Sequence, residues 1–291
     1  MIHLLCTVAR SILLASCSKH GDRTPCMVPV NVCVTGFNIS QEDFPSKAAQ
    51  MVADYTDVKA ITLAFYASDG TEVLKTTQLR GDASNYITFG NFSCALPIGT
   101  FTMVVIGRGH FDGDVLTLTS PTEAAYTSER VRETFSTTQG VSVNSTNPIN
   151  LSVTLNRIIS KLNIVSTDGR SAGITRIRTT YSAGGKNFNP TTGLATSNSG
   201  YSLTNNPSTA TGSPIGITSF IFLASDEQTI DVTIEAMDAS NNVLFSKVVE
   251  GVSFKRNRVT TLSGPVFTAP TGAATFQLET GWLDPITVDF N

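Results

Sequence analysis

The chain has 291 residues, a net charge of −3 and a pI near 5.6, and only 15% of its residues are charged. This balance gives no electrostatic attraction to nucleic acid, and 41% hydrophobic residues with so little net charge exclude a disordered chain. Ser and Thr are abundant instead, at 29 and 40 residues. Because Thr is β-branched and fits a pleated, half-exposed surface, the composition predicts an all-β protein.

Residues 1–16 have the character of an export signal. The apolar run at residues 4–16 is shorter than the ~20 residues that a membrane-spanning helix needs. Leu14-Ala15-Ser16-Cys17 resembles a bacterial lipobox, which implies cleavage after Ser16 and lipid attachment to Cys17. Arg10 interrupts the apolar run, which a misplaced start codon would explain, and the alternative interpretation is an ordinary secretory signal with a chance cysteine. A lipid on Cys17 would hold the mature chain on a membrane that it does not cross.

Strand signals dominate the chain after residue 26. Residues 28–34 are apolar at nearly every second position, which predicts a strand. Residues 58–66 and 71–79 flank Ser68-Asp69-Gly70, a pattern typical of a β-hairpin. Further strands are predicted at residues 101–107, 149–155, 162–166, 174–181, 220–223, 230–237, 243–249, 275–280 and 286–290. Many short strands separated by Gly, Asn and Ser favour β-sandwiches.

Two stretches predict helices. Ser120-Pro121-Thr122-Glu123 has the capping-box pattern, with Ser as N-cap and Pro in the first turn, and predicts a short helix to about residue 135. Residues 46–54 predict a second helix. Residues 182–219 are rich in Gly, Ser, Thr, Asn and Pro without a clear period, and predict long loops.

A boundary near residues 156–160 divides the mature chain into two predicted domains. Residues 17–157 would form an N-terminal β-sandwich and residues 158–291 a C-terminal one. Each is long enough for about seven or eight strands.

Three cysteines remain after Cys17. Cys26 and Cys33 lie seven residues apart on a predicted strand and face opposite ways, so they cannot pair with each other. A disulfide from either one to Cys94 stays open, and the alternative is three small hydrophobic residues.

Chemistry-bearing motifs are sparse. His110, Asp112 and Asp114 alternate and could hold a divalent cation on a strand, but the Asp-Gly step predicts a turn there. A hydrolase would have to use His110 or His20, and the sequence has no Gly-x-Ser-x-Gly elbow, Cys-x-x-Cys or phosphate-binding glycine loop. We therefore predict no catalytic residue, no metal site, no cofactor and no enzymatic activity.

Two further features have a binding interpretation and a plainer one. Lys255-Arg256-Asn257-Arg258 would either contact an acidic glycan or lipid head group, or form a polar turn before a strand. Trp282 would either stack on a sugar or lie in a core.

Several segments in order resemble one known family. They are the lipobox, the strand and turn at residues 58–70, Leu-Pro-Ile-Gly-Thr-Phe-Thr at 96–102, Leu-Asn-Arg-Ile-Ile-Ser-Lys-Leu at 155–162, Phe-Lys-Arg-Asn-Arg-Val-Thr-Thr-Leu-Ser-Gly at 254–264, and a closing strand with Trp282. Together they resemble the fimbrillin superfamily of the Bacteroidales type V pili, within its fimbrial anchor and minor-subunit branch.

The resemblance implies two tandem transthyretin-like β-sandwiches, the first with a short helix or two. It also implies an outer-membrane lipoprotein on the cell surface that joins other fimbrial subunits by β-strand exchange. The candidate exchange edges are Met27, Val28, Val30, Val32 and Val34 at one end and Ile286, Val288 and Phe290 at the other.

Stalk subunits of this family lose their lipid and first strand to an Arg-specific protease. The sequence has no Arg between residues 24 and 79, so an anchor or assembly-initiating subunit is favoured. The alternative is a glycan-binding or adhesin lipoprotein for host or bacterial surface ligands. An exposed row of aromatic residues beside Trp282 or Tyr201 would favour it.

Overall fold

The computed structural model describes residues 26–39, 50–82, 84, 86–110, 116–268, 275–277 and 283–289. These residues form strands and contain no helix, which confirms the all-β prediction. The strands are β1 (Met27–Asn38), β2 (Gln50–Met51), β3 (Ala60–Ala67), β4 (Glu72–Leu79), β5 (Asn91–Pro97), β6 (Gly99–Arg108), β7 (Leu116–Ser120), β8 (Glu123–Tyr126), β9 (Thr134–Val143), β10 (Ile149–Arg157), β11 (Ser160–Ser166), β12 (Arg176–Tyr181), β13 (Asn187–Phe188), β14 (Tyr201–Asn205), β15 (Gly216–Ile221), β16 (Glu227–Met237), β17 (Val243–Lys255), β18 (Arg258–Gly264), β19 (Thr275–Gln277) and β20 (Leu283–Asp289). Within these residues, no helix is long and apolar enough to cross a membrane.

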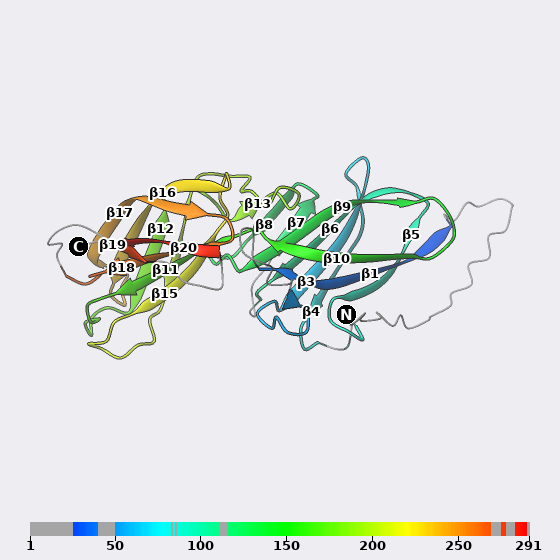
Figure 1. Ribbon diagram of the computed structural model, residues 1–291. Helices are drawn as coiled ribbons and strands as arrows, with labels where there is room; N and C mark the ends of the chain where they lie inside the picture. The colour runs from blue at the N-terminus through cyan, green and yellow to red at the C-terminus, as the bar shows by residue number, and fades with distance from the viewer. Residues whose placement is uncertain are drawn as a thin grey trace.

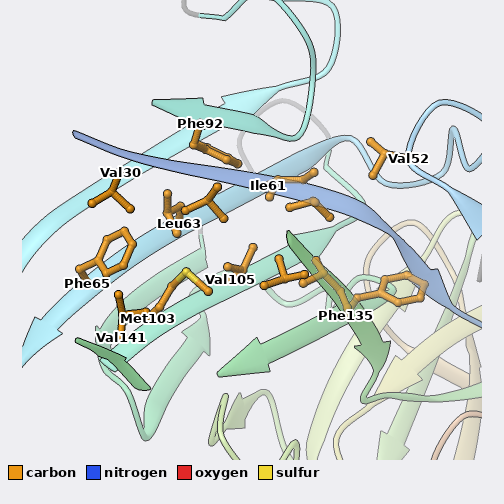
Figure 2. Close-up of a cluster of buried hydrophobic side chains, with 14 of the residues drawn as sticks. Val30, Val52, Ile61, Leu63, Phe65, Phe92, Met103, Val105, Phe135 and Val141 are labelled. Atoms are coloured by element: carbon orange, nitrogen blue, oxygen red, sulfur yellow. The ribbon is translucent and has the colours of Figure 1, made fainter. Parts of the chain in front are cut away.

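The largest sheet folds over on itself. Its path is β2-β1-β10-β9-β6-β3-β4, with β5 also paired to β1. The link between β10 and β9 is narrow, because only Asn156↔Ser136 and Arg157↔Phe135 pair. The layer of β5, β1 and β10 therefore separates from the layer of β9, β6, β3 and β4, and apolar side chains of both layers fill the space between them (Figures 1 and 2). We call this filling the first core; it includes Val30, Ile61, Leu63, Phe65, Phe92, Met103, Val105, Phe135 and Val141.

Two further sheets lie at the other end of an elongated molecule (Figure 1). Their strand orders are β15-β11-β18-β19-β20 and β14-β12-β16-β17. Buried residues of both sheets form a second core, which includes Leu162, Ile164, Ile177, Tyr181, Ile221, Val232, Ile234, Phe254 and Leu262.

A small sheet, β13-β8-β7, covers the outer face of β3 and β6. Tyr66 and Ile106 of that face pack in one buried cluster with Tyr126 of β8. Phe188 of β13 stacks on Phe222 with ring centroids 4.2 Å apart. This third cluster joins segments between residues 64 and 222.

The hairpin predicted at residues 58–79 is confirmed. β3 pairs with β4 around Ser68-Asp69-Gly70, and Gly70 has a φ of +85°, a left-handed conformation that suits glycine. The Asp69 carboxylate accepts a hydrogen bond from the backbone N–H of Thr71 at 2.9 Å, as turn aspartates do.

The helix predicted at residues 120–135 is wrong. Ser120-Pro121-Thr122-Glu123 forms the turn of the β7–β8 hairpin, and the Ser120 hydroxyl accepts the Thr122 N–H there. Beyond the turn, Ala124 and Tyr126 are buried while Glu123 and Ala125 are not, so burial follows the two-residue period of a strand. The Ser120 hydroxyl, predicted to cap a helix, therefore accepts a backbone N–H within a hairpin turn instead.

Two other expectations also need correction. Residues 46–49 of the second predicted helix lie outside the described residues, and residues 50–54 form β2 and a turn. The predicted loops at 182–219 contain β13, β14 and most of β15. The alternation that marks β15, with Ile217, Ser219 and Ile221 buried, begins only at the end of that polar stretch.

Candidate strand-exchange site

The first candidate exchange strand, β1, lies inside its sheet. It runs parallel to β10 from Val30↔Ile149 to Asn38↔Asn156, and antiparallel to β5 from Met27↔Pro97 to Cys33↔Asn91. The predicted edge at Met27, Val28, Val30, Val32 and Val34 is therefore a paired interior strand in this structure, so exchange there would require β1 to leave.

The inward face of β1 supplies one side of the first core. Val28, Val30, Val32 and Val34 are all at most 4% exposed. A register shift between Val34 and Gly36 then changes the phase, so the next fully buried side chain is Phe37. Burying four valines and a phenylalanine is worth on the order of 10 kcal/mol of transfer free energy, which makes β1 a major part of the core.

The outward face of β1 carries a polar ladder that the sequence analysis missed. The side chains of Asn31 and Asn150 hydrogen-bond at 2.9 Å, those of Thr35 and Thr154 at 3.0 Å, and those of Asn38 and Asn156 at 2.7 Å. The spacing of Asn, Thr and Asn is nearly the same in both segments, with one extra residue in β1. That matched spacing was the available signal for a parallel pair.

Cys94 of β5 lies directly opposite Val30. Its thiol donates to the Val30 carbonyl at 3.4 Å, and burial raises the pKa of the Cys94 thiol to about 11. Within the described part of the chain, no disulfide joins Cys94 to Cys26 or Cys33. Of the two alternatives left open, the structure therefore shows the one without a disulfide.

The end of β1 meets a buried cation, Arg157, whose side chain is 1% exposed. Its Nε lies 2.8 Å from Glu133 Oε1, and its Nη2 donates to the Tyr55 hydroxyl at 2.9 Å. Its Nη1 donates to the Ile39 carbonyl at 3.2 Å and to Asn257 Oδ1 at 3.0 Å. We call Tyr55, Glu133, Arg157 and Asn257 the Arg157 cluster.

Burial raises the pKa values of two acids in this cluster, Tyr55 and Glu133. Burial raises the pKa of Tyr55 well above its ordinary value, with Glu133 adding to the effect, so the phenol stays protonated and donates to Glu133 Oε1 at 2.9 Å. Burial also raises the pKa of Glu133, although Arg157 and Tyr55 oppose the shift. Sequence analysis found neither Tyr55 nor Glu133, because neither lies in a motif.

Asn257 holds the turn between β17 and β18. It is 1% exposed with a φ of +60°, and its N–H donates to the Ile159 carbonyl at 2.9 Å. The flanking cations are engaged, since Lys255 pairs with Glu227, and Arg256 lies 2.7 Å from Asp226 and donates to the Thr192 carbonyl at 2.7 Å. Residues 255–258 thus form a polar turn before a strand. Within that turn, Asn257 accepts the hydrogen bond from Arg157, which belongs to the motif at residues 155–162.

A polar cavity of about 330 Å³ lies beside the Arg157 cluster. Its walls come from β9, the end of β10, the loop at residues 190–193 and Arg256. Gly193 is required in that loop, because its φ is +74° and a Cβ there would lie 2.7 Å from Ile158 Cγ2.

The second candidate exchange strand, β20, is the last strand of its sheet path. Ile286 pairs with Thr260 of β18, and Val288 lies in the same strand. Phe290, Trp282, Ser16 and Cys17 lie outside the described residues.

The remaining candidates are placed as follows. His110 Nδ1 lies 3.1 Å from Arg108 Nη1, while Asp112 and Asp114 lie outside the described residues. Among the residues described, no group of three or more His, Cys, Asp or Glu could hold a metal ion. The Tyr201 ring packs 5.2 Å from that of Tyr181 and its hydroxyl donates to the Phe220 carbonyl, so Tyr201 offers no open stacking platform for a sugar.

Residues 32–290 match the model of a family described as a family of unknown function, DUF6562. The chain belongs to this family. None of the curated proteins compared with the DUF6562 chain matches it.

Solved structures share its fold. A candidate adhesin from Bacteroides ovatus is 11% identical to this chain, and the superposition has a TM-score of 0.50. The aligned region covers 82% of this chain and 88% of the adhesin chain. The fimbrial anchor protein Mfa2 from Porphyromonas gingivalis is 11% identical, with 78% and 84% covered and a TM-score of 0.48. A fimbrial assembly protein from Parabacteroides distasonis is 12% identical, with 84% and 92% covered and a TM-score of 0.39. At an identity of 11%, the likeness to the Bacteroides ovatus structure is one of fold alone.

Proposed function

We propose that this DUF6562 chain is a structural subunit of a cell-surface fimbria that keeps its first strand, in the role of an anchor or assembly-initiating subunit. The observation that carries the proposal is β1, which is paired on both sides and fills one face of the first core. A sandwich without this strand would expose an apolar groove and two unpaired strands, which is the condition for strand addition.

Arg80 supports the retention of β1. It is the first Arg after Arg23, so it is the earliest site after β1 at which an Arg-specific protease could act. Its Nε donates to the Val58 carbonyl at 2.8 Å, its Nη2 donates to the Val52 carbonyl at 2.8 Å, and the guanidinium lies 4.2 Å from the Phe89 ring centroid. A protease would have to pull this side chain out of its contacts, so cleavage between β1 and β5 is disfavoured.

The proposal assigns the joining strand to β20 and the membrane attachment to lipid on Cys17. β20 ends its sheet path, and its residue pairs with β18 are few, so it can leave with less disruption than β1. Two transthyretin-like sandwiches, residues 17–157 and 158–291, form part of the same proposal.

Crosslinking on intact cells tests this function. Photo-crosslinkers at Ile286 and Val288, followed by purification of the chain and mass spectrometry, should recover fimbrial subunits, and the mature N-terminus should lie before Met27. A crosslinker at Thr76, exposed on β4, is the matched control and should recover no such subunit. Recovery of polysaccharide without a fimbrial subunit, or a mature N-terminus after Val34, would overturn the proposal.

A further inference from the structure

The Arg157 cluster gathers segments that are far apart in the chain. Arg157 Nη1 contacts the Ile39 carbonyl, 118 residues away, and Asn257, 100 residues away. We propose that this cluster is a binding site for the end of the chain's own first strand, residues 26–39. Its ligand is an extended peptide that places an aromatic side chain where Phe37 lies and a backbone carbonyl where that of Ile39 lies.

An aromatic pocket receives the side chain. The Phe37 ring centroid lies 5.0 Å from that of Phe135 and 5.7 Å from that of Tyr55, and the Arg157 guanidinium lies 5.1 Å from the Phe135 ring centroid. Gly107 forms the floor, since a Cβ there would lie 3.0 Å from Phe37 Cε1. The pocket is therefore already full with a phenylalanine, and a smaller side chain would leave a void.

The register shift makes the site selective. Apolar residues of β1 face inward at 28, 30, 32 and 34, and the next inward ring is at 37, because one extra residue intervenes. A strand that alternates without this slip would place its ring on the outward face, beside the polar ladder. The cluster thus distinguishes a peptide with the β1 pattern from any other apolar strand.

Asn257 connects this site to the distant β17–β18 turn. The same Arg157 Nη1 donates to Ile39 and Asn257, so the strand end and the turn share one donor group. When the strand end is absent, Arg157 loses one of its acceptors inside a buried cluster. Because coupling between two sites is reciprocal, filling the β1 position should stabilise the left-handed turn at Asn257.

The inference rests on the proposed function, in which the subunit keeps β1 in its place, but its test uses only the chain itself. A specific protease site is placed between residues 40 and 49 of the full mature chain. After folding, cleavage at this site breaks the covalent link between β1 and the rest of the chain, while β1 stays bound in its sheet. A fluorescent peptide of residues 26–39 is then exchanged into the cut protein, and its release rate is measured.

The expected result is a specific pattern of release rates. A peptide that ends at Asn38 as its amide keeps the Asn38 hydrogen bond but lacks the Ile39 carbonyl, and should leave about tenfold faster, since a hydrogen bond to a charged group is lost. In Arg157→Met, or in Arg157→Leu if the first variant does not fold, this truncation should make a clearly smaller difference, because only the burial of the Ile39 side chain is then lost. A peptide carrying Val30→Ala should leave faster from both proteins alike, because Val30 does not touch the cluster.

Hydrogen exchange provides the second measurement. Loss of the peptide should speed exchange of the Asn257 amide while leaving that of Asn241, which also has a positive φ, unchanged. Equal release of full and truncated peptides from the unaltered protein, or a truncation effect in the Arg157 variant as large as in the unaltered protein, would overturn the inference. Because no fimbrial partner takes part, a failure of the proposed function would not alter these outcomes.

Discussion

Arg157 shows how this protein handles a charge removed from water. Breaking a buried pair by removing one partner leaves the other charge uncompensated, at a cost of about 3–5 kcal/mol, yet a buried pair as a whole often adds little net stability. The Arg157 Nε forms an ion pair with Glu133, and its two Nη atoms donate to Tyr55, Ile39 and Asn257. The cluster therefore fixes a geometry more than it adds to the free energy of unfolding.

Cys94 should report on stability at high pH. Its folded-state pKa is about 11 against an ordinary value of 9.0, so folding favours the protonated thiol. The stability that Cys94 contributes should be complete below about pH 9 and should be lost as the pH rises toward 11. Urea unfolding at several pH values, compared with Cys94→Ser, should show the difference in free energy shrinking across this range.

The same thiol should react slowly with iodoacetamide at pH 8, because the thiolate is the reacting form. Labelling followed by peptide mass analysis should show Cys94 protected in the folded chain and modified in urea. In the urea experiment, a difference in the free energy of unfolding between wild type and Cys94→Ser that stays constant from pH 8 to 11 would contradict the raised pKa of Cys94.

At the scale of elements, the loop that carries Gly193 should be far less tolerant than the β3–β4 turn. Gly193 and Gly70 both have positive φ, but a Cβ at Gly193 meets Ile158 Cγ2 at 2.7 Å, whereas nothing lies within 4 Å at Gly70. We expect Gly70→Ala to cost about 1 kcal/mol from backbone strain alone, and Gly193→Ala to cost about 1–3 kcal/mol more from overpacking. Chemical denaturation of the two variants measures this, and equal losses would contradict it.

Sequence patterns predicted elements well where two local signals agreed. Around Ser68-Asp69-Gly70 the alternation and the turn residues both indicate a hairpin, and the hairpin is there. At Ser120 the capping signal is ambiguous, because the same side-chain to backbone bond that caps a helix also closes a hairpin turn. Only the period-two burial of Ala124 and Tyr126 against β3 and β6 decides between them, and that depends on tertiary contacts.

The candidate site was predictable only in its parts. The apolar face of β1 and the two motifs containing Arg157 and Asn257 could be read from the sequence. Their meeting could not, because Arg157 and Asn257 are 100 residues apart and nothing local encodes the contact. Glu133 and Tyr55 lie in segments without periodicity, so only the fold shows that they share a cation.

At the scale of the whole molecule, the proposed membrane attachment rests on one residue, Cys17. If lipid on Cys17 holds the chain, Cys17→Ser should move the protein from the membrane pellet to the soluble fraction and abolish labelling by a radioactive fatty acid. Cys26→Ser, nine residues later, is the matched control and should change neither. Fractionation and labelling of cells expressing each variant measure this, and a Cys17→Ser protein that stays in the pellet would contradict lipid anchoring.

The pairing of β1 with β10 also has a consequence for the order of folding. During synthesis β1 emerges first, but its bonded partners on β10 follow 118–119 residues later. β5 can reach β1 sooner, since Cys94 and Val30 are 64 residues apart. Pairings of such high sequence separation slow folding, because loop closure must come before the contacts that reward it. The first strand made therefore waits, with the backbone edge that β10 pairs still unpaired, until residues 149–157 arrive.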